Sequence, residues 1–422
     1  MTYDVVVADD LTGASDTLVQ FLPCSERAIV FPSLRGFERA VRDGEIPHGS
    51  VAIGVNTESR HLPPRKAARR VLRAHRAALR LAPRLLFQKV DSAMRGNPGA
   101  ELAAYRCATA SRNVLMTPAF LPSRRTVKDG VLFVNGVPLS QSEVSADIRT
   151  PMDDSSVAIV LHRQTDVPVS HLSVTTLCGS KIAAQNAIER APDGIIVADA
   201  ECQENLDLLA RLVFAAKLEH AVSGSAGLAG SLSRLLPPIP PAVRQAVAPR
   251  CLATLVIFGS PHPVAVAQLH SAAACFGAIE RQPDVLGMPR GIAALADQLA
   301  VDLADSGIAM LTAPGSSSNE RLDPSAVAAA LSRIAVHMMK RGLADALVVS
   351  GGDVAAAVCK ALRVEWIELN QQVYPGAPLG LISGGIGNGL TIVTKSGAHG
   401  DEQGLTTILT ALRDPQTGVG ER

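Results

Sequence analysis

The sequence predicts an α/β protein of two α/β domains, with mainly parallel sheets and a ligand-binding cleft between the domains. Short apolar runs alternate with helical segments along most of the chain, which is the pattern of parallel strands covered by helices. The chain has 422 residues, of which 47% are hydrophobic, and this length suits two such domains. A proline-rich segment, residues 237–241, interrupts the alternation near the middle of the chain.

The first predicted domain covers residues 1–236. The apolar runs that predict its strands lie at residues 5–8, 28–31, 51–55, 85–90, 113–116, 157–161, 194–198 and 220–223. Helical patterns are clearest at residues 63–81 and 100–110. Residues 131–139 differ, because Asn135-Gly136 stands between apolar residues and this dipeptide favours a tight hairpin. We therefore expect a β-hairpin excursion in the first domain.

The prolines at residues 237–241 predict the start of a stiff linker, residues 237–249. A proline-rich loop inside a single domain is the alternative. A second α/β domain is then expected over residues 250–422, with strands at 251–258, 309–312, 346–349, 366–369, 380–383 and 390–394. Its helices are expected at residues 264–274, 324–341, 354–362 and 403–412, and the last eight residues are expected to fray.

The composition argues against nucleic-acid and membrane binding. The formal net charge is +1 and aromatic residues make up 3% of the chain, so neither a basic field nor a base-stacking surface is indicated. No apolar stretch is long enough to span a membrane, and no secretory leader pattern precedes the first strand. The seven cysteines are scattered singly, which suits reduced thiols. We expect a cytoplasmic protein whose partners are small molecules.

Polar residues follow the first apolar run at the point where a buried strand should end. The segment Asp9-Asp10-Leu11-Thr12-Gly13-Ala14-Ser15-Asp16 brings carboxylates and hydroxyls to this strand end. Ligands of open α/β sheets bind at the carboxyl ends of the strands. Adjacent carboxylates repel each other, and a metal, a polyol or an amine would relieve that repulsion. The alternative is that Asp10 or Thr12 only caps the following helix.

Similar polar clusters follow three further apolar runs. They have the sequences NTESR at residues 56–60, KVDSAMRGN at residues 89–97 and, within residues 118–130, PAF and RRTVKDG. Arginine offers a fork for a carboxylate and lysine a point charge. The alternatives are a surface ion pair for Lys89 and Asp91, and a helix cap for Asn97 before Pro98. Because parallel strand ends converge on one edge, the clusters predict one active site for a small anionic, hydroxyl-bearing ligand.

Glycine-rich turns follow three of the strands predicted in the second domain. Their sequences are FGSPHP at residues 258–263, SGGDV at residues 350–354 and KSGAHG at residues 395–400. Glycines let backbone N–H groups approach phosphate oxygens, and a helix N-terminus adds a positive dipole. These turns therefore predict a phosphate-binding site. A fourth glycine-rich segment, residues 384–389, is explained equally well by a tight turn.

Several common catalytic motifs are absent from the sequence. There is no GxxxxGK[ST] segment, no GxGxxG after an early strand and no protein-kinase signature. The segment SGSAG at residues 223–227 is not a nucleophile elbow, because Ser223 stands where that motif needs glycine. A Walker-type NTPase, a nicotinamide-dependent dehydrogenase and a serine hydrolase are therefore disfavoured.

Taken together, these segments resemble the four-carbon acid sugar kinase family. The matching segments are ADDLTGASDT, KVDSAMRGN, PAF with RRTVKDG and VNGVPL, SGSAGLA, FGSPHP, SGGDVAAAV and KSGAHGDEQGL, in family order across almost the entire chain. The resemblance implies an N-terminal sugar-acid domain, a C-terminal nucleotide domain and ATP-dependent phosphorylation of the terminal hydroxyl of a four-carbon sugar acid. The KVDSAMRGN form is closer to D-threonate or D-erythronate kinases than to 3-oxo-tetronate kinases. A 3-oxo-tetronate kinase and a non-catalytic sensor of sugar acid and nucleotide are the alternatives, and the resemblance is compatible with a homodimer.

The resemblance also implies site residues. Those of the sugar-acid site are Asp10, Arg60, Lys89, Val90, Asp91 and Ser92. Those of the ATP site are Ser260, Gly351, Gly352, Asp353, Val354 and Gly397. In the expected mechanism Arg60 and Lys89 hold the substrate, and a catalytic carboxylate, Asp10 or else Asp91, orients or deprotonates the terminal hydroxyl. Mg²⁺ would bridge the ATP phosphates, and Asp9 or Asp353 could contact it through water. The sequence does not assign direct protein ligands to this ion.

Overall fold

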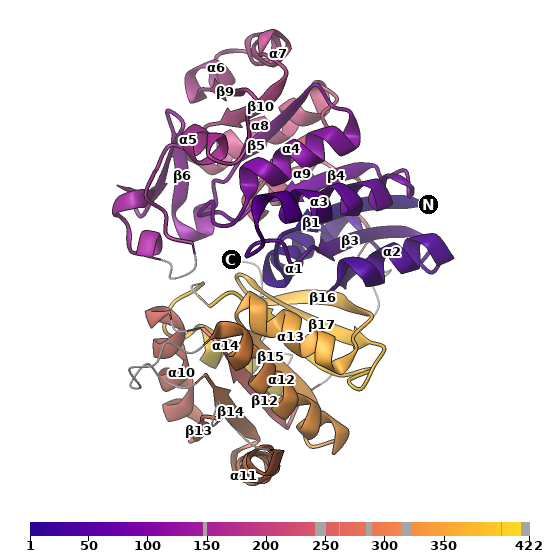
Figure 1. Cartoon of the computed structure of the whole chain (residues 1–422), viewed down its shortest axis with the longest axis vertical. Coiled ribbons are helices and arrows are strands. Elements are labelled where there is room, and N and C mark those ends of the chain that lie inside the picture. Colours follow the sequence, from indigo (N-terminus) through magenta and orange to yellow (C-terminus); the bar gives the residue numbers. More distant parts are fainter. Residues whose placement is uncertain are drawn as a thin grey trace. The chain divides into compact units, whose positions relative to one another are not determined.

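The computed structural model describes residues 1–146, 150–240, 250–260, 262–283, 289–313, 323–397 and 399–414. It divides into two compact units, Met1–Arg244 and Gln245–Arg422 (Figure 1). Both units are α/β with mostly parallel strands, which confirms the predicted fold class. Residues 241–249 of the predicted linker and the predicted tail, residues 415–422, lie outside the described residues. In the described part of the chain, no helix is long and apolar enough to cross a membrane.

The first unit is built on a parallel sheet in the order β2-β3-β1-β4-β11-β5-β10-β9. Its strands are β1 (Thr2–Ala8), β2 (Arg27–Phe31), β3 (Ser50–Asn56), β4 (Leu85–Lys89), β5 (Asn113–Thr117), β9 (Val169–Leu172), β10 (Gly194–Ala198) and β11 (Val222–Gly224). β1 lies between β3 and β4, in a register that places Ala8 opposite Asn56 and Lys89. The residues that follow these three strands therefore leave the sheet at one level.

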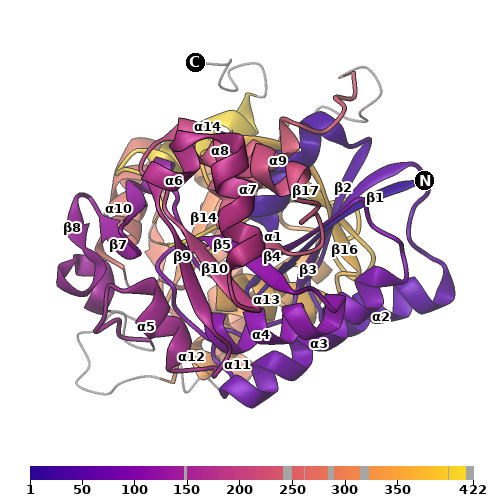
Figure 2. The same ribbon diagram turned by 90° about the horizontal axis from the view of Figure 1, so that it is seen from above.

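Helices cover both faces of this sheet (Figure 2). They are α1 (Leu11–Leu18), α2 (Leu34–Asp43), α3 (Pro64–Leu79), α4 (Pro98–Thr109), α5 (Val157–His162), α6 (Val174–Gly179), α7 (Lys181–Arg190), α8 (Gln203–Ala215) and α9 (Ala226–Ser233), with a 3₁₀ helix η1 (Val19–Cys24) after α1. α2, α3 and α4 pack side by side on one face, while α1, α8 and α9 pack on the other. Both faces of the strands are thus removed from water, as their nearly continuous apolar sequences require.

The strand predicted at residues 157–161 is wrong, because this segment forms helix α5. Ser156 caps the helix by accepting a hydrogen bond from the Ile159 N–H group at 3.4 Å. The helix buries Val157, Val160 and Leu161 and leaves Ile159 46% exposed. A short apolar run is equally compatible with a buried strand and with a short buried helix, so sequence pattern alone did not separate the two.

The predicted hairpin is confirmed and belongs to a small antiparallel sheet. The sheet has the order β6-β7-β8, with β6 (Arg125–Lys128), β7 (Val131–Val134) and β8 (Val137–Pro138). Asn135 and Gly136 have φ values of 53° and 79°, as a two-residue hairpin turn requires. Short 3₁₀ turns flank it: η2 (Leu121–Ser123), η3 (Leu139–Gln141) and η4 (Glu143–Ala146). This insertion carries Arg125 to the start of β6.

The second unit has a mixed sheet in the order β13-β14-β12-β15-β18-β17-β16. Its strands are β12 (Thr254–Phe258), β13 (Glu280–Arg281), β14 (Ile308–Thr312), β15 (Ala346–Ser350), β16 (Trp366–Tyr374), β17 (Ala377–Ser383) and β18 (Thr391–Lys395). β16 and β17 form an antiparallel hairpin, and β17 is antiparallel to β18. The remaining neighbours are parallel, and their register aligns Phe258, Ser350 and Lys395. The loops that follow β12, β15 and β18 therefore start at the same level.

The helices of the second unit follow its parallel strands. They are α10 (Pro263–Phe276), α11 (Pro289–Ser306), α12 (Pro324–Lys340), α13 (Gly352–Leu362) and α14 (Gly404–Arg413). An apolar core lies beneath α10 and α14, where Val256, Leu269, Val348, Val393 and Leu409 are all buried. Its close packing gives the strand ends above it a rigid base.

A buried histidine makes the stability of the first unit depend on pH. His75 in α3 is fully buried, stacks on Tyr105 with ring centroids 4.2 Å apart, and lies 2.7 Å from Gln88 Oε1 through Nε2. Burial lowers the pKa of His75 to about 3, so the ring stays neutral in the fold while the unfolded chain takes up a proton below about pH 6.5. We expect His75 to lower the free energy of unfolding by about 1.4 kcal/mol per pH unit from pH 6.5 downward. Urea unfolding at several pH values should show this slope as the difference between wild type and His75→Gln, whereas exposed His48→Gln should behave like wild type.

Candidate active site

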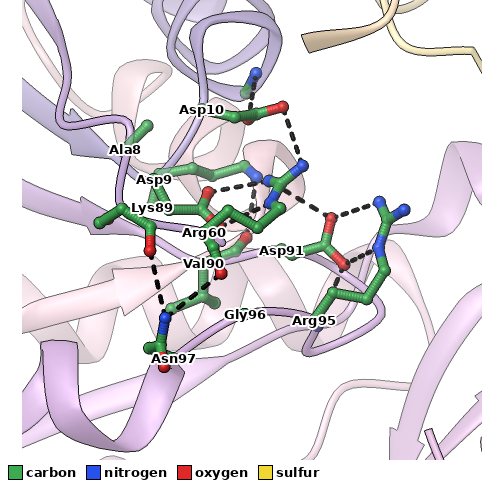
Figure 3. A network of polar contacts seen from close by, with 12 residues as sticks. Ala8, Asp9, Asp10, Arg60, Lys89, Val90, Asp91, Arg95, Gly96 and Asn97 are labelled. Carbon is green, nitrogen blue, oxygen red and sulfur yellow. Dashed lines mark hydrogen bonds and ion pairs between the residues drawn. The ribbon is translucent and has the colours of Figure 1, made fainter. Parts of the chain in front are cut away.

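Three strand ends of the first unit bring the predicted sugar-acid residues together. β1 continues into Asp9 and Asp10, β3 continues toward Arg60, and β4 ends at Lys89 and continues into Asp91. Figure 3 shows these side chains converging at the carboxyl edge of the sheet. The convergence expected from the sequence is therefore present within this unit.

Arg60 supplies the positive charge that the adjacent carboxylates need. Its Nε and Nη2 atoms donate to Asp9 Oδ2 and Oδ1 at 2.7 and 2.8 Å, and its Nη1 atom donates to Asp10 Oδ2 at 2.8 Å (Figure 3). Asp10 also caps α1, since its Oδ1 accepts from the Gly13 N–H group at 2.8 Å and its Oδ2 from the Thr12 hydroxyl at 2.7 Å. Both readings of Asp10, as a cap and as a site residue, are thus compatible with its contacts.

Asp91 is held by a second arginine. Arg95 Nε and Nη2 donate to its two carboxylate oxygens, both at 2.8 Å, and Arg60 Nη2 lies 3.6 Å from its Oδ1 atom. The Asp91 carboxylate also accepts from the Ala93 N–H group at 3.1 Å. The surface ion pair considered for Lys89 and Asp91 does not form among the described residues. Lys89 is buried instead and donates to the Val90 carbonyl at 2.8 Å.

Burial and the arginines shift the carboxyl pKa values in opposite directions. Burial raises the pKa of Asp9 above its usual value, although Arg60 opposes this. Burial also disfavours the charged form of Asp10, but Arg60 and a neighbouring lysine outweigh it and lower the pKa of Asp10. For Asp91 burial is likewise outweighed, because Arg95 and Arg60 hold its pKa well below the usual range. Asp10 and Asp91 are therefore ionised at neutral pH.

Asn97 and Glu101 bind the loop that carries Arg60. The Asn97 amide does not cap its helix; its Nδ2 atom donates to the carbonyls of Ser59, Arg60 and Leu62 at 3.1, 3.2 and 2.9 Å. Asn97 thereby fixes the loop that presents Arg60. Glu101 accepts from the Ser59 hydroxyl at 2.6 Å, and burial, with Asp9 nearby, raises the pKa of Glu101 to about 8.

Three charged residues of this region were not among the predicted site residues. Arg95 lies four residues after Asp91, and this spacing within KVDSAMRGN was the available signal. Arg125 donates to the Ser92 hydroxyl, and burial lowers the pKa of Arg125 to about 10. Its Nε atom is buried without an acceptor. Asp16 lies on α1 near Lys89; the sequence placed it in the polar segment after the first strand but assigned it no role of its own.

The predicted nucleotide residues lie together at the strand ends of the second unit. A Cβ atom added to Gly397 would lie 2.1 Å from Ser260 Oγ, so only a glycine permits this approach. Gly351 has φ of 105° and its added Cβ would lie 3.9 Å from the Ser260 N atom. Gly352 and Asp353 belong to the first turn of α13, and Val354 follows them. A Cβ atom added to Gly259 would lie 2.2 Å from Val354 Cγ2, so the turn after β12 packs closely against the start of α13. Ala398 and Pro261, which belong to the same motifs, lie outside the described residues.

The fourth glycine-rich segment, residues 384–389, forms a turn that lies at a distance from these residues. A Cβ atom added to Gly385 would lie 2.1 Å from the Leu362 carbonyl oxygen, at the end of α13. The Ile386 N–H group donates to the same carbonyl at 2.9 Å. Because β17 runs antiparallel, the loop after it emerges at the edge opposite the Ser260 turn. Its glycines therefore serve chain reversal.

Lys395 is buried at the last position of β18, beside the Gly351 and Gly397 turns. Its side chain has no exposed surface, and its Nζ atom donates to the Ser396 carbonyl at 2.9 Å. The described residues place no carboxylate in ion-pair contact with it, and burial lowers the pKa of Lys395 to about 7. The Lys395 carbonyl accepts from the Gly351 N–H group at 2.9 Å and links the two turns.

The described residues contain no cluster of three or more His, Cys, Asp or Glu side chains that could hold a metal ion. Asp9 and Asp10, the acidic pair considered for this role, direct carboxylate oxygens at Arg60. These side chains do not fit a dedicated metal site.

Comparison with known proteins identifies the class of both units. Residues 5–232 match the model of a sugar-binding N-terminal domain, and residues 255–405 match the model of a nucleotide-binding C-terminal domain. Together with full-length relatives that are named kinases, these matches define a phosphotransferase, a sugar-acid kinase that uses ATP. The chain belongs to the four-carbon acid sugar kinase family.

Full-length relatives support this assignment. The chain is 32% identical to the D-threonate kinase of Bordetella bronchiseptica, with 98% of each chain aligned. It is 27% identical to the D-erythronate kinase of Heliobacterium modesticaldum, over 98% of this chain and 97% of the relative. It is 28% identical to the 3-oxo-tetronate kinase of Methylobacterium radiotolerans, over 93% of this chain and 95% of the relative.

Solved structures share the fold. A protein from Salmonella typhimurium LT2 aligns with a TM-score of 0.78 at 21% identity, over 97% of this chain and 99% of that one. A Haemophilus influenzae protein of the DUF1537 family aligns with a TM-score of 0.67 at 19% identity, over 97% of this chain and 100% of that one. At these identities the likeness establishes the fold alone.

Proposed function

We propose that this kinase phosphorylates the terminal (4-) hydroxyl of D-threonate or D-erythronate. The relatives named D-threonate and D-erythronate kinases align over 98% of this chain. The charged groups and hydrogen-bond donors of the first unit are nevertheless what would select the substrate of this chain.

The observation that carries the proposal is a buried arginine with an unused donor at the edge of the first sheet. The cations there are Arg60, Lys89, Arg95 and Arg125, and the carboxylates around them are Asp9, Asp10, Asp16 and Asp91. The Arg125 Nε atom is buried and has no acceptor among the described residues. A buried guanidinium without a full set of acceptors is costly unless a ligand supplies one. A substrate carboxylate would accept a hydrogen bond from this atom.

The hydroxyls of a sugar acid would meet the remaining polar atoms. Ser92, Lys89 and the Val90 carbonyl lie beside Arg125 or the carboxylates and can donate to or accept from hydroxyls. Asp10 and Asp91 are the candidate catalytic carboxylates from the sequence. Each has both oxygens engaged by other donors, and each has a lowered pKa. In this proposal they orient substrate hydroxyls by accepting hydrogen bonds.

The ATP phosphates would bind at the second unit's strand ends. Backbone N–H groups of residues 351–354 at the start of α13, with the Ser260 hydroxyl beside Gly397, form a donor set suited to phosphate. Mg²⁺ is expected to arrive on the phosphates of ATP and to lower their charge in transfer. The described side chains fit no resident metal, so no step is assigned to a protein-bound ion.

The substrate is tested by measuring ADP release with MgATP and a panel of D-threonate, D-erythronate, L-threonate and 3-oxo-tetronate. We expect kcat/KM for D-threonate or D-erythronate to exceed that for 3-oxo-tetronate by at least about tenfold, a difference of about 1.4 kcal/mol in transition-state binding. Phosphorus NMR of the product should place the phosphate on the terminal oxygen. A preference for 3-oxo-tetronate would overturn the substrate assignment. Absence of turnover with every acid, with nucleotide binding intact, would favour a sensor.

The nucleotide site is tested by Gly397→Ala. The added methyl group would lie 2.1 Å from Ser260 Oγ and 2.3 Å from Ser260 Cβ, so the turn must move. We expect the KM for ATP to rise by at least about tenfold, with little change in the KM for the sugar acid. The matched control is Gly291→Ala in α11, where an added Cβ meets no atom within 4 Å. An unchanged KM for ATP in Gly397→Ala would contradict the assignment.

A further inference from the structure

The first unit holds a buried carboxylate oxygen to which no donor among the described residues makes a hydrogen bond. Asp16 lies on α1, and its Oδ1 atom is buried without a hydrogen-bond partner. The carboxylates of Asp9, Asp10 and Asp91 are each bound directly by an arginine. Buried polar atoms in native proteins are rarely left without a partner, so the vacancy on Asp16 calls for a ligand.

The geometry of α1 directs Asp16 toward the sugar-acid site. A Cβ atom added to Gly13 would lie 3.4 Å from Lys89 Nζ and 2.5 Å from Asp10 Oδ1, so this face of α1 borders both residues. Asp16 lies three residues later, which places it on the same face one turn along the helix. Gly13 and Asp16 are also less buried than their neighbours Ala14, Ser15 and Thr17. Because Gly13 has no side chain, no atom of this residue fills the space beside Lys89 Nζ.

We infer that Asp16 is the general base of the phosphoryl transfer, acting on the terminal hydroxyl of the sugar acid. This inference rests on the proposed function. The hydroxyl oxygen attacks the γ-phosphorus of ATP and forms the new P–O bond. The bond from that phosphorus to the bridging oxygen breaks, and ADP leaves with its electron pair. The hydroxyl proton passes to the free Oδ1 atom of Asp16 and then to solvent.

The ionisation of Asp16 suits this role better than that of the other carboxylates. Burial raises the pKa of Asp16 to about 6, with Lys89 opposing the rise and Asp10 adding to it. A general base is most effective when its pKa lies near the working pH. Asp10 and Asp91, with lowered pKa values, are weaker bases and have no free oxygen comparable to Asp16 Oδ1.

Few other titratable groups can account for ionisation in this pH range. α1 packs against β1, β2, β3, β4, η1 and α9. α9 and β3 carry no titratable side chain, and β4 faces Asp16 with Lys89. The other titratable groups of these elements belong to the opposite edge of the sheet, namely Tyr3, Asp4, Cys24 and Arg27. Glu101, with a pKa of about 8, would produce a separate transition.

The test compares Asp16→Asn with wild type and with Asp43→Asn, which changes an exposed carboxylate at the end of α2. We expect Asp16→Asn to lower kcat by about 10²- to 10⁴-fold with KM values for acid and ATP within about threefold of wild type. The wild-type kcat/KM profile should lose activity below about pH 6, because protonated Asp16 cannot accept a proton, and Asp16→Asn should lack this limb. Asp43→Asn should keep both kcat and the limb.

The outcomes separate this inference from the proposed function. Wild-type inactivity on every acid would overturn both the proposed function and the inference. If the wild-type enzyme is active and Asp16→Asn keeps the full kcat, only the assignment of Asp16 as the general base is overturned. A loss confined to the KM for the acid would also overturn it, because Asp16 would then only balance Lys89. Thermal unfolding checks that the variants fold, and Asp16→Ser provides a second variant with no carboxylate.

Discussion

Replacing Arg60 with methionine is expected to abolish measurable turnover and to lower the free energy of unfolding by about 3–5 kcal/mol at pH 8. Arg60 donates to both oxygens of Asp9 and to Asp10, and it lies 3.6 Å from Asp91. Its removal leaves buried carboxylates next to each other without their shared cation. Urea unfolding and ADP release with MgATP and D-threonate measure the two effects.

The pH dependence of this variant should identify the cause of its instability. Without Arg60 the pKa values of Asp9 and Asp10 rise in the folded state, so protonation relieves the repulsion. A group whose folded pKa is raised favours folding below that pKa and loses this contribution as pH rises. We therefore expect Arg60→Met to regain stability as the pH falls from 8 toward 5.

Arg84→Met is the control that separates folding from catalysis. Arg84 donates to both oxygens of Asp4 near the beginning of β1, at the edge of the sheet opposite Arg60. Its loss also leaves a buried carboxylate unpaired, so some stability should be lost. Turnover by the folded fraction should stay at the wild-type level. A folded Arg60→Met enzyme with wild-type kcat and KM would contradict the role given to Arg60.

The convergence of the candidate site residues could be predicted because it depends on short-range patterns. Apolar runs of strand length alternate with helices, and this pattern dictates a parallel sheet whose carboxyl ends share one edge. Asp10, Arg60 and Lys89 each stand just after such a run. Their convergence follows from topology and needs no knowledge of side-chain contacts.

The pairing of charges within the site could not be predicted, because it depends on distant contacts. Arg60 and Asp9 are separated by 51 positions, and the sequence did not reveal that arginine would relieve the repulsion assigned to a metal, polyol or amine. Arg125 reaches Ser92 from the inserted hairpin sheet. Such partners depend on how an insertion folds back, which no local pattern encodes.

The sequence also did not show which single polar groups are buried without a partner. Asp16 and Lys395 stand in motifs whose other members attract attention. Only the structure shows that, among the described residues, Asp16 Oδ1 has no donor and Lys395 has no carboxylate in ion-pair contact. The helix at α5 was missed for a related reason. Its six residues are too few for a helical period to show, and Ser156, which caps the helix, was the available local signal.

Lys395→Met is expected to stabilise the second unit while weakening ATP binding. Burial lowers the pKa of Lys395 to about 7, so folding carries a desolvation cost that a methionine of similar length would not incur. We expect the free energy of unfolding at pH 7 to rise by a few kcal/mol, the order implied by so large a pKa shift. The KM for ATP should rise by at least about tenfold, because the turns around Lys395 would lose their buried cation.

The pH dependence of unfolding distinguishes this cause from better packing by methionine. Between about pH 7 and 10.5 the unfolded chain binds a proton at Lys395 that the folded chain does not, so Lys395 should contribute a rise in stability of about 1.4 kcal/mol per pH unit, measured as the difference between wild type and Lys395→Met. Lys395→Met should lack this slope, while Lys340→Met at the exposed end of α12 should keep it.

Proton uptake on nucleotide binding provides a second measurement. At pH 8 the wild-type protein should take up protons when it binds MgATP, because the phosphate charge raises the pKa of Lys395. Calorimetry in buffers of different ionisation enthalpy measures this uptake. A Lys395→Met enzyme with the wild-type slope and wild-type KM for ATP would show that this buried lysine neither limits stability nor serves the nucleotide.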